Sequence, residues 1–204
     1  LSFGFKLAPL TINTVPYHDK FEENQIFLGL KNIKGLPRDL AYWIIEERPF
    51  TGIEDFLLRL PSQYRKESSL ITLVQIGLFD SFEPNRQKII SNLSNLFIFL
   101  GSLFADSSYS WTEAEDYSQA EKFELEQSIL GVGLSDHPLM TIAKATTESF
   151  SWIGDLAENS RAKILAQVQS IKVIRTKNGE NMAFLQVTDT KKKLDVTLFP
   201  ETYK

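Results

Sequence analysis

The sequence predicts a mainly α-helical fold with a β module towards its C-terminal end. Apolar residues recur with the helical period of 3.6 in several segments up to about residue 145. From Ala162 onward apolar and polar residues alternate, which is the period of a half-buried strand. The dipeptide Asn178-Gly179 then marks a tight hairpin turn between two such strands. These three observations predict two domains, the first helical and the second a β-meander.

Composition argues against several classes of function. The 204 residues carry 22 Lys and Arg against 26 Asp and Glu, a formal charge of −4, and no cysteine. Without cysteine there is no disulfide, thiolate nucleophile or Cys-ligated zinc, which suits a reducing cytoplasm. The two histidines, His18 and His137, lie far apart in the sequence, which argues against a histidine metal site or a catalytic triad. No apolar run approaches the ~20 residues of a membrane helix, so we expect a cytoplasmic protein with no membrane partner.

The first elements are predicted from local stop and start signals. Residues 25–29 are typical of a short strand bounded by polar residues and glycine. Pro37 begins a helix whose apolar face recurs at helical spacing until the chain reaches Pro49. Thr51, followed three residues later by Glu54, predicts a capping box that opens the next helix.

Three further helices precede the β module. A helix over residues 67–76 ends at Gly77, at the position where a left-handed residue usually terminates a helix. Asn85 is predicted to cap the next helix, and Ser118 another that ends near Gly131. The residues between these last two helices are polar, acidic and aromatic without a helical period, so we expect a loop there.

Two segments share the order helix, glycine-containing hairpin, helix. A helix N-terminus carries partial positive charge and favours an anion such as a DNA phosphate. One such unit also fits a plain helical turn with solvated lysines, whereas two in tandem indicate a paired helix-hairpin-helix that grips duplex DNA. The candidate duplex-binding residues are Lys31, Lys34, Gly35 and Arg38 in the first unit and Gly77, Arg86 and Lys88 in the second.

Charge is distributed unevenly along the chain. Residues 101–130 hold seven acids against one base, a local net of −6, whereas residues 162–204 hold eight bases against four acids, a local net of +4. A coiled strand, a basic hairpin and two further strands are how an OB-fold barrel begins, and such barrels bind single strands through a basic groove with stacking aromatics. Phe184 or Phe199 would be such an aromatic, although strand phenylalanines more often lie in a core. The candidate single-strand-binding residues are Arg175, Lys177, Lys191, Lys192 and Lys193.

Motifs along the whole chain resemble the DnaE-type alpha subunits of bacterial DNA polymerase III. Residues 130–139 are similar to that family's Leu-Gly-x-x-x-Ser-x-His-Pro-Leu signature. Residues 175–184 resemble the Lys-x-Gly-x-x-Met-Ala-Phe opening of its OB domain. Less specific matches are Ile12-Asn13, residues 27–35, residues 50–59 and residues 76–80.

The resemblance implies a fragment from the C-terminal region of a DNA-directed DNA polymerase, a nucleotidyltransferase of replication. In that family aspartates upstream of the matching region hold the two catalytic metal ions, expected to be Mg²⁺. We therefore expect no catalytic residue, metal or cofactor in this fragment. The implied partners are primer–template duplex, single-stranded template, the sliding clamp and other replisome subunits. The chain departs from the family at Pro37, which replaces a second hairpin glycine and removes one N–H donor.

A pentapeptide of the acidic region is similar to the clamp-binding motif Gln-Leu-Ser/Asp-Leu-Phe of bacterial polymerases. It is Leu100-Gly101-Ser102-Leu103-Phe104, and its last three residues match the motif. In the family this motif lies between the hairpin domain and the OB domain, where adjacent Leu and Phe side chains would fill a pocket on the clamp. The alternative is that Leu103 and Phe104 close the hydrophobic core at the end of a helix.

These interpretations divide the chain into five parts. Residues 1–36 are a lead-in from the polymerase core with a short strand, and residues 37–100 are the tandem helix-hairpin-helix domain. Residues 101–117 form an acidic loop with the clamp-binding peptide, and residues 118–160 form a helical connector. Residues 161–204 are the first strands of a truncated OB-fold barrel.

Two other functions fit the same residues. A DNA repair or recombination adaptor without polymerase activity could use the same modules, and a native gene product of only this length would favour it. An interaction domain with no DNA role is the third hypothesis, for which absent or salt-independent DNA binding would be the sign.

Overall fold

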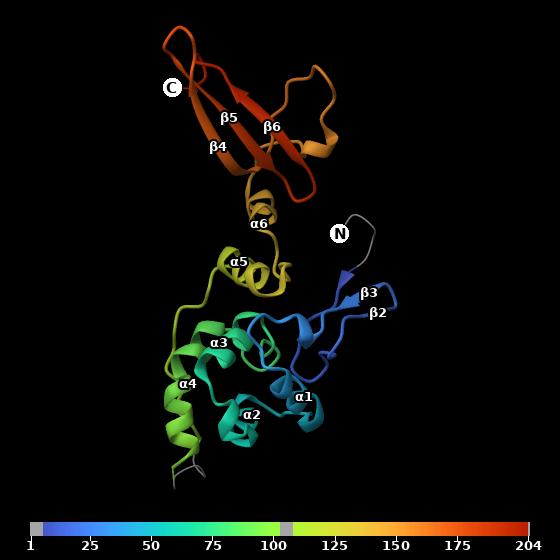
Figure 1. The fold of residues 1–204 in the computed structure, drawn as a ribbon, viewed down its shortest axis with the longest axis vertical. Helices are drawn as coiled ribbons and strands as arrows, with labels where there is room; N and C mark the ends of the chain where they lie inside the picture. The colour runs from blue at the N-terminus through green and yellow to red at the C-terminus, as the bar shows by residue number, and fades with distance from the viewer. Residues whose placement is uncertain (1–5, 103–107, 204) are drawn as a thin grey trace. The chain divides into compact units, whose positions relative to one another are not determined.

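A computed structural model describes residues 6–102 and 108–203 and divides the chain into two compact units (Figure 1). The first unit comprises the described residues up to Asp136, and the second comprises those from His137 onward. The predicted order of a helical part followed by a β part is confirmed. The predicted connector over residues 118–160 is divided between the two units.

The first unit opens with a small sheet and continues as helices. Strands β1 (Lys6–Leu7), β3 (Gln25–Phe27) and β2 (Lys20–Glu22) lie side by side in that order, with β1 parallel and β2 antiparallel to β3. The helices that follow are η1 (Leu30–Asn32), α1 (Arg38–Glu47), α2 (Ile53–Arg59), η2 (Ser62–Tyr64), α3 (Glu67–Gln75), α4 (Arg86–Leu100) and α5 (Gln119–Leu130).

These helices share one hydrophobic core with the segment that precedes them. Leu40 and Ile44 of α1 are fully buried, as is Ile12 of the segment that we predicted to be a separate lead-in. The Phe56 ring lies at the centre, 5.0 Å from the ring of Phe79. Residues 6–36 therefore belong to the helical unit. The segments before and after the first hairpin both pack into its hydrophobic core.

Helix ends explain why most boundaries were predictable. The Asn85 side chain accepts a hydrogen bond from the Lys88 backbone N–H, and Ser118 forms a complete capping box. The capping box predicted at Thr51 does not form. The backbone N–H of Thr51 instead donates to Asp55, and the Glu54 carboxylate accepts from the Trp111 indole at 3.0 Å. The Glu54 carboxylate, which the local sequence pattern assigned to the helix cap, is thus hydrogen-bonded to Trp111, a residue distant in the sequence.

The acidic region after α4 is fastened to that helix where the structure describes it. Asn92, which is fully buried on α4, accepts hydrogen bonds from the Tyr109 hydroxyl and the Thr112 backbone N–H. Its amide nitrogen donates to the carbonyl oxygens of Lys88 and Thr112, both at 2.8 Å. Residues 109–112 are thus a loop, as predicted, but one that packs on the helical core.

The second unit is a three-stranded antiparallel meander preceded by short helices. Its elements are α6 (Pro138–Ala145), η3 (Ile153–Asp155), β4 (Gln167–Arg175), β5 (Asn181–Thr188) and β6 (Lys193–Leu198). Gly179 adopts φ +84° in the β4–β5 turn, which confirms the predicted hairpin. The sequence did not predict α6, whose N-cap is His137: the Nδ1 atom accepts the Leu139 backbone N–H.

One face of the sheet is apolar, and the described residues bury only part of it. Ile171, Leu185 and Val196 face one another across the three strands. The centre of this face is buried, since Ala183 is 0% exposed, but Ile171 on the edge strand β4 is 60% exposed. The three described strands form an open sheet, not a closed barrel.

No helix in the two described ranges is long and apolar enough to cross a membrane.

Candidate nucleic-acid interface

The first hairpin is an exposed turn between η1 and α1. Gly35 adopts φ +80°, and a Cβ built on it would meet nothing within 4 Å. Within the two described ranges, the backbone N–H groups of Lys34 and Gly35 have no acceptor in the chain. Pro37, the N-cap of α1, has no N–H of its own. This exposed hairpin therefore offers two amide donors without an acceptor in the described residues, and an anion can bind to such donors.

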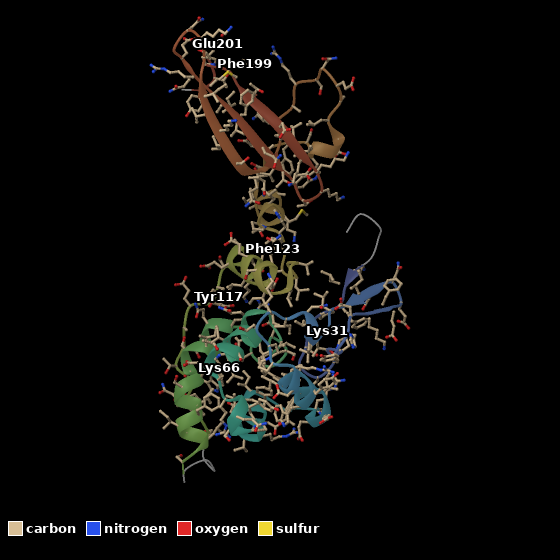
Figure 2. All side chains as sticks on the ribbon, in the orientation of Figure 1. Lys31, Lys66, Tyr117, Phe123, Phe199 and Glu201 are labelled. Carbon is tan, nitrogen blue, oxygen red and sulfur yellow. The ribbon has the colours of Figure 1, made fainter. Side chains whose placement is uncertain are left out.

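Three predicted cations surround this hairpin and are exposed. Lys31, labelled in Figure 2, lies on η1, which packs beside α1, and its side chain is exposed. Arg38 begins α1, and its guanidinium lies 5.4 Å from the centroid of the Tyr42 ring one turn later. The Lys34 ammonium donates to the carbonyl oxygen of Ser128 near the end of α5, at 2.7 Å. The first unit thus brings together all four residues predicted here.

Two tyrosines complete the surface, and sequence reasoning missed them. The rings of Tyr17 and Tyr42 stack with centroids 4.4 Å apart. The hydrogen bond from Arg38 lowers the pKa of Tyr42, whereas burial and the Tyr42 hydroxyl raise the pKa of Tyr17. The spacing of Arg38 and Tyr42, four residues apart on a helix, was the available signal. Tyr17 carries no such signal, because it joins the cluster only through the fold.

The second hairpin differs from the prediction. Gly77 adopts φ +81° as expected of a helix-ending residue, but it is buried, and its N–H donates to the Val74 carbonyl at 2.9 Å. A Cβ on Gly77 would overlap the Arg86 guanidinium. The space next to this glycine is therefore filled by a side chain of the chain itself, and the Gly77 amide is not available to a phosphate.

Arg86, predicted to contact DNA, lies in the interior. It is 4% exposed. Its guanidinium makes three hydrogen bonds to Asp80, one to the Gln75 carbonyl and an ion pair with Glu126 at 2.9 Å. Burial would lower the pKa of Arg86, but the hydrogen bonds to Asp80 and Glu126 outweigh it and raise the pKa. The positive charge is thus neutralised inside the protein, and Arg86 has a structural role.

Glu126 connects this arginine to the chain segment after α5. The carboxylate is 0% exposed. One oxygen accepts the backbone N–H groups of Leu134 and Ser135, both at 2.6 Å, and the other accepts the Ser135 hydroxyl at 2.8 Å. These residues belong to the motif at 130–139 that resembles the family signature. The motif therefore forms a packed turn around a buried carboxylate.

Lys88 of α4 is engaged by two acidic side chains. Its ammonium lies 3.3 Å from Glu83 and 2.7 Å from Glu113. The hydrogen bond to Glu113, opposed by partial desolvation, raises the pKa of Lys88. Because its charge is balanced on both sides, Lys88 contributes little net field at the surface.

The cations predicted for single-strand binding lie at the two turns of the sheet in the second unit. The Arg175 guanidinium donates to the Gly179 carbonyl within the β4–β5 turn at 2.9 Å, and Lys177 is exposed in that turn. Lys191, Lys192 and Lys193 are exposed at the β5–β6 turn. The Phe184 ring on β5 is 44% exposed, so it is not a core residue of the described sheet.

The candidate clamp-binding peptide is only partly described. Leu100 is the last residue of α4 and packs against the core, and Gly101 is the C-cap. The Ser102 hydroxyl donates to the Phe99 carbonyl at 2.7 Å. Leu103 and Phe104, the two anchor residues of the hypothesis, lie outside the described residues.

The described residues contain no group of three or more His, Cys, Asp or Glu side chains that could hold a metal ion.

Comparison with known proteins places this geometry in context. Residues 4–89, which include both hairpins, match the family model described as helix-hairpin-helix motif. Across its whole length the chain is 58% identical over 207 residues to a DNA polymerase III subunit alpha of Streptococcus pyogenes. The chain is related to the alpha subunit of bacterial DNA polymerase III. The resemblance predicted from the sequence is confirmed.

More distant alpha subunits match the same region. The subunit of Aquifex aeolicus is 29% identical over 214 residues, covering 99% of this chain and 18% of the subunit. That of Staphylococcus epidermidis is 28% identical over 211 residues, covering 97% of this chain and 20% of the subunit. The chain thus spans about a fifth of the length of the relatives it matches, 20% for the S. pyogenes subunit.

Proposed function

We propose that this chain is a DNA-binding segment of a replicative DNA-directed DNA polymerase, and that it grips the duplex phosphate backbone at the first hairpin. The observation that supports this most is the exposed turn at Gly35, with its two amide donors and the cations Lys31, Lys34 and Arg38. The match of residues 4–89 to the helix-hairpin-helix model supports it independently.

The physical basis of the grip is sequence-independent. Amide donors fix a phosphate at the turn, and the cations displace counterions from the DNA around it. Only the first hairpin carries this role in our proposal, because Arg86 fills the space at Gly77 and Lys88 is paired with two carboxylates. The second hairpin then serves to hold α3 and α4 in place.

The second unit has a separate role in this proposal. Strands β4 to β6 are the first strands of an OB-fold barrel that contacts the single-stranded template. The support is the order of a coiled strand and two hairpin-connected strands, with Arg175, Lys177 and Lys191 to Lys193 at the turns. The apolar face that the described strands leave partly uncovered is consistent with further strands in a longer protein.

The activity of the whole protein is part of the same proposal. The longer protein performs DNA-templated nucleotidyl transfer in the cytoplasm with Mg²⁺ bound outside this segment. Residues 100–104 tether it to the sliding clamp, and other replisome subunits are further partners. The relatives, each named as an alpha subunit of DNA polymerase III, support this extension.

The test is the salt dependence of duplex binding. The double variant Lys31→Gln/Arg38→Gln should weaken binding to all duplex sequences alike and reduce the slope of log affinity against log salt by about one unit per lost phosphate contact. Lys66→Gln is the control for a charge lost elsewhere, since Lys66 is an exposed lysine before α3, away from the hairpin (Figure 2). An unchanged slope in the double variant would reject the assignment.

A further inference from the structure

The second unit contains a partly enclosed cavity of about 200 Å³. It lies between the start of α6, the η3 turn and the turn that joins β5 to β6. Met140 and Trp152 form much of its mostly apolar lining, and Gly154 and Asp155 add the edge of η3. Residues 189–192 form the opposite side.

A buried carboxylate fixes the shape of this cavity. Asp189 is 5% exposed. One of its oxygens accepts the Ile153 backbone N–H at 2.8 Å, and the other accepts those of Lys191 and Lys192 at 2.7 and 2.6 Å. The same side chain thus ties η3 to the β5–β6 turn, so the two walls are held in place before any ligand arrives.

The Trp152 ring also packs against a second aromatic ring. The Trp152 ring packs edge-to-face on Phe150 with centroids 5.1 Å apart. An indole supported in this way presents a rigid flat surface at little entropic cost when a planar ligand stacks on it.

The rim of the cavity is positive. Lys191 and Lys192 are exposed, and the charge of Lys191 also acts on the Asp189 carboxylate. Lys192 extends along the rim, because a Cβ on Gly154 would lie 3.6 Å from its Cε and 3.8 Å from its Nζ. Three backbone N–H groups and the nearby Lys191 charge stabilise the Asp189 carboxylate, and the exposed Asp155 is the further acceptor at the rim.

We propose that this cavity takes one nucleobase of a single-stranded DNA, with the base against Trp152 and Met140 and the flanking phosphates against Lys191 and Lys192. The inference rests on the proposed single-strand binding and names a site for it outside the strand faces. A flat apolar wall beside two adjacent exposed lysines matches a base that carries a phosphate on either side. Asp155 can accept a hydrogen bond from an exocyclic amino group of the base.

The first experiment observes the Trp152 indole directly in the 204-residue chain. Three indole N–H resonances are expected in a nitrogen–proton correlation spectrum, from Trp43, Trp111 and Trp152, and Trp152→Phe assigns the third. Adding an oligodeoxyadenylate should shift the Trp152 resonance and leave that of Trp43, which packs on Phe50 and Phe56, in place.

The second experiment measures affinity by fluorescence anisotropy with the same labelled oligomer. Trp152→Ala should weaken binding about tenfold or more, and Trp152→Phe should restore most of the loss because a smaller ring still stacks. Lys191→Gln/Lys192→Gln should weaken binding and flatten its salt dependence. Lys66→Gln in the first unit is the control for a lysine charge lost away from the cavity, and circular dichroism checks that each variant is folded.

The outcomes separate this inference from the function on which it rests. If the oligomer binds but neither the Trp152 resonance nor the Trp152→Ala affinity changes, the cavity is not the site and single-strand binding stands elsewhere on the sheet. If the wild-type chain does not bind the oligomer, both proposals fail. Deoxyadenosine monophosphate binding as tightly as the oligomer, or an acidic aromatic peptide shifting Trp152 where the oligomer does not, would overturn the inference. Should Trp152→Ala fail to fold, the wild-type resonance alone decides.

Discussion

Arg86 and Glu126 form an ion pair of 2.9 Å in which both side chains are nearly or fully excluded from solvent. Glu126 also accepts two backbone N–H groups of the turn after α5, so the pair joins α4, α5 and that turn. Removing one member leaves the other charge buried without its partner, which is costly even where the intact pair contributes little net stability.

We expect Glu126→Ala to lower the free energy of unfolding by about 3–5 kcal/mol. Urea denaturation followed by circular dichroism measures the change, and Glu124→Ala, an exposed position on the same helix, should change it by less than about 0.5 kcal/mol. The double variant Arg86→Met/Glu126→Ala should lose less than the sum of the single losses, because neither charge is then left alone. Strict additivity would show that the two residues do not interact energetically.

A second prediction concerns pH and the start of α4. Asp116 accepts hydrogen bonds from the backbone N–H groups of Arg86 and Tyr117 and pairs with Lys122. Burial by itself would raise the pKa of Asp116, but the hydrogen bonds from Lys122 and from the backbone N–H groups of Gln87 and Tyr117 outweigh it and lower the pKa. A lowered carboxyl pKa in the folded state contributes stability that is complete above the unfolded value, about pH 4, and is lost as the pH falls through the folded value.

The free energy of unfolding should therefore fall below about pH 4, and more steeply in the wild type than in Asp116→Asn, which has no charge to lose. Urea titrations at a series of pH values measure this. Glu115→Gln, a change at an exposed neighbour, should retain the wild-type profile. Parallel profiles for wild type and Asp116→Asn would mean that another group carries the acid sensitivity.

The two hairpin glycines offer a matched pair for a third prediction. Both have φ near +80°, but Gly35 faces open space, whereas a Cβ on Gly77 would overlap the Arg86 guanidinium. Gly35→Ala should cost about 1–2 kcal/mol from the backbone alone. Gly77→Ala should cost more, since it also displaces a buried ion pair. Thermal midpoints of the two variants test this, and equal losses would contradict the burial of Arg86 beside Gly77.

A fourth prediction separates the effect of the orientation of Arg38 from the effect of its charge at the proposed duplex site. Tyr42→Phe removes the hydroxyl that Arg38 contacts at 3.4 Å but keeps the ring beneath the guanidinium. Duplex affinity should fall about two- to fivefold, the size of a lost exposed polar contact. The salt slope should stay unchanged, because no cation is lost. A change in the slope would show that Tyr42 acts on more than the orientation of Arg38.

Features set by neighbouring residues in the sequence were predictable. The caps at Asn85 and Ser118, the left-handed residue at Gly77 and the Asn-Gly turn each depend on a few adjacent positions, and each formed as expected. The exposed cations of the first hairpin were found for the same reason.

Features set by distant partners were not predictable. Arg86 has the spacing of a surface cation after a hairpin, and only the fold brings Glu126 against it. Glu54 lost its expected cap to an indole 57 positions away in the sequence. The cavity beside Trp152 likewise depends on Asp189, 36 positions after the Ile153 backbone that it holds. A pattern read along a single sequence gives no signal for such pairs.

Asn92 shows how such packing limits the substitutions that a position can accept during evolution. Its side chain uses two donors and two acceptor sites at once, on Lys88, Tyr109 and Thr112. Aspartate would place a carboxylate next to two carbonyl oxygens. Leucine would leave the Lys88 and Thr112 carbonyl oxygens, the Tyr109 hydroxyl and the Thr112 N–H without this hydrogen-bond partner and away from water. The apolar positions around it can exchange among Leu, Ile and Met at small expense in stability. No other residue type satisfies the four hydrogen bonds made at position 92. We therefore expect substitutions in this part of α4 to accumulate at the surrounding positions while Asn92 is retained.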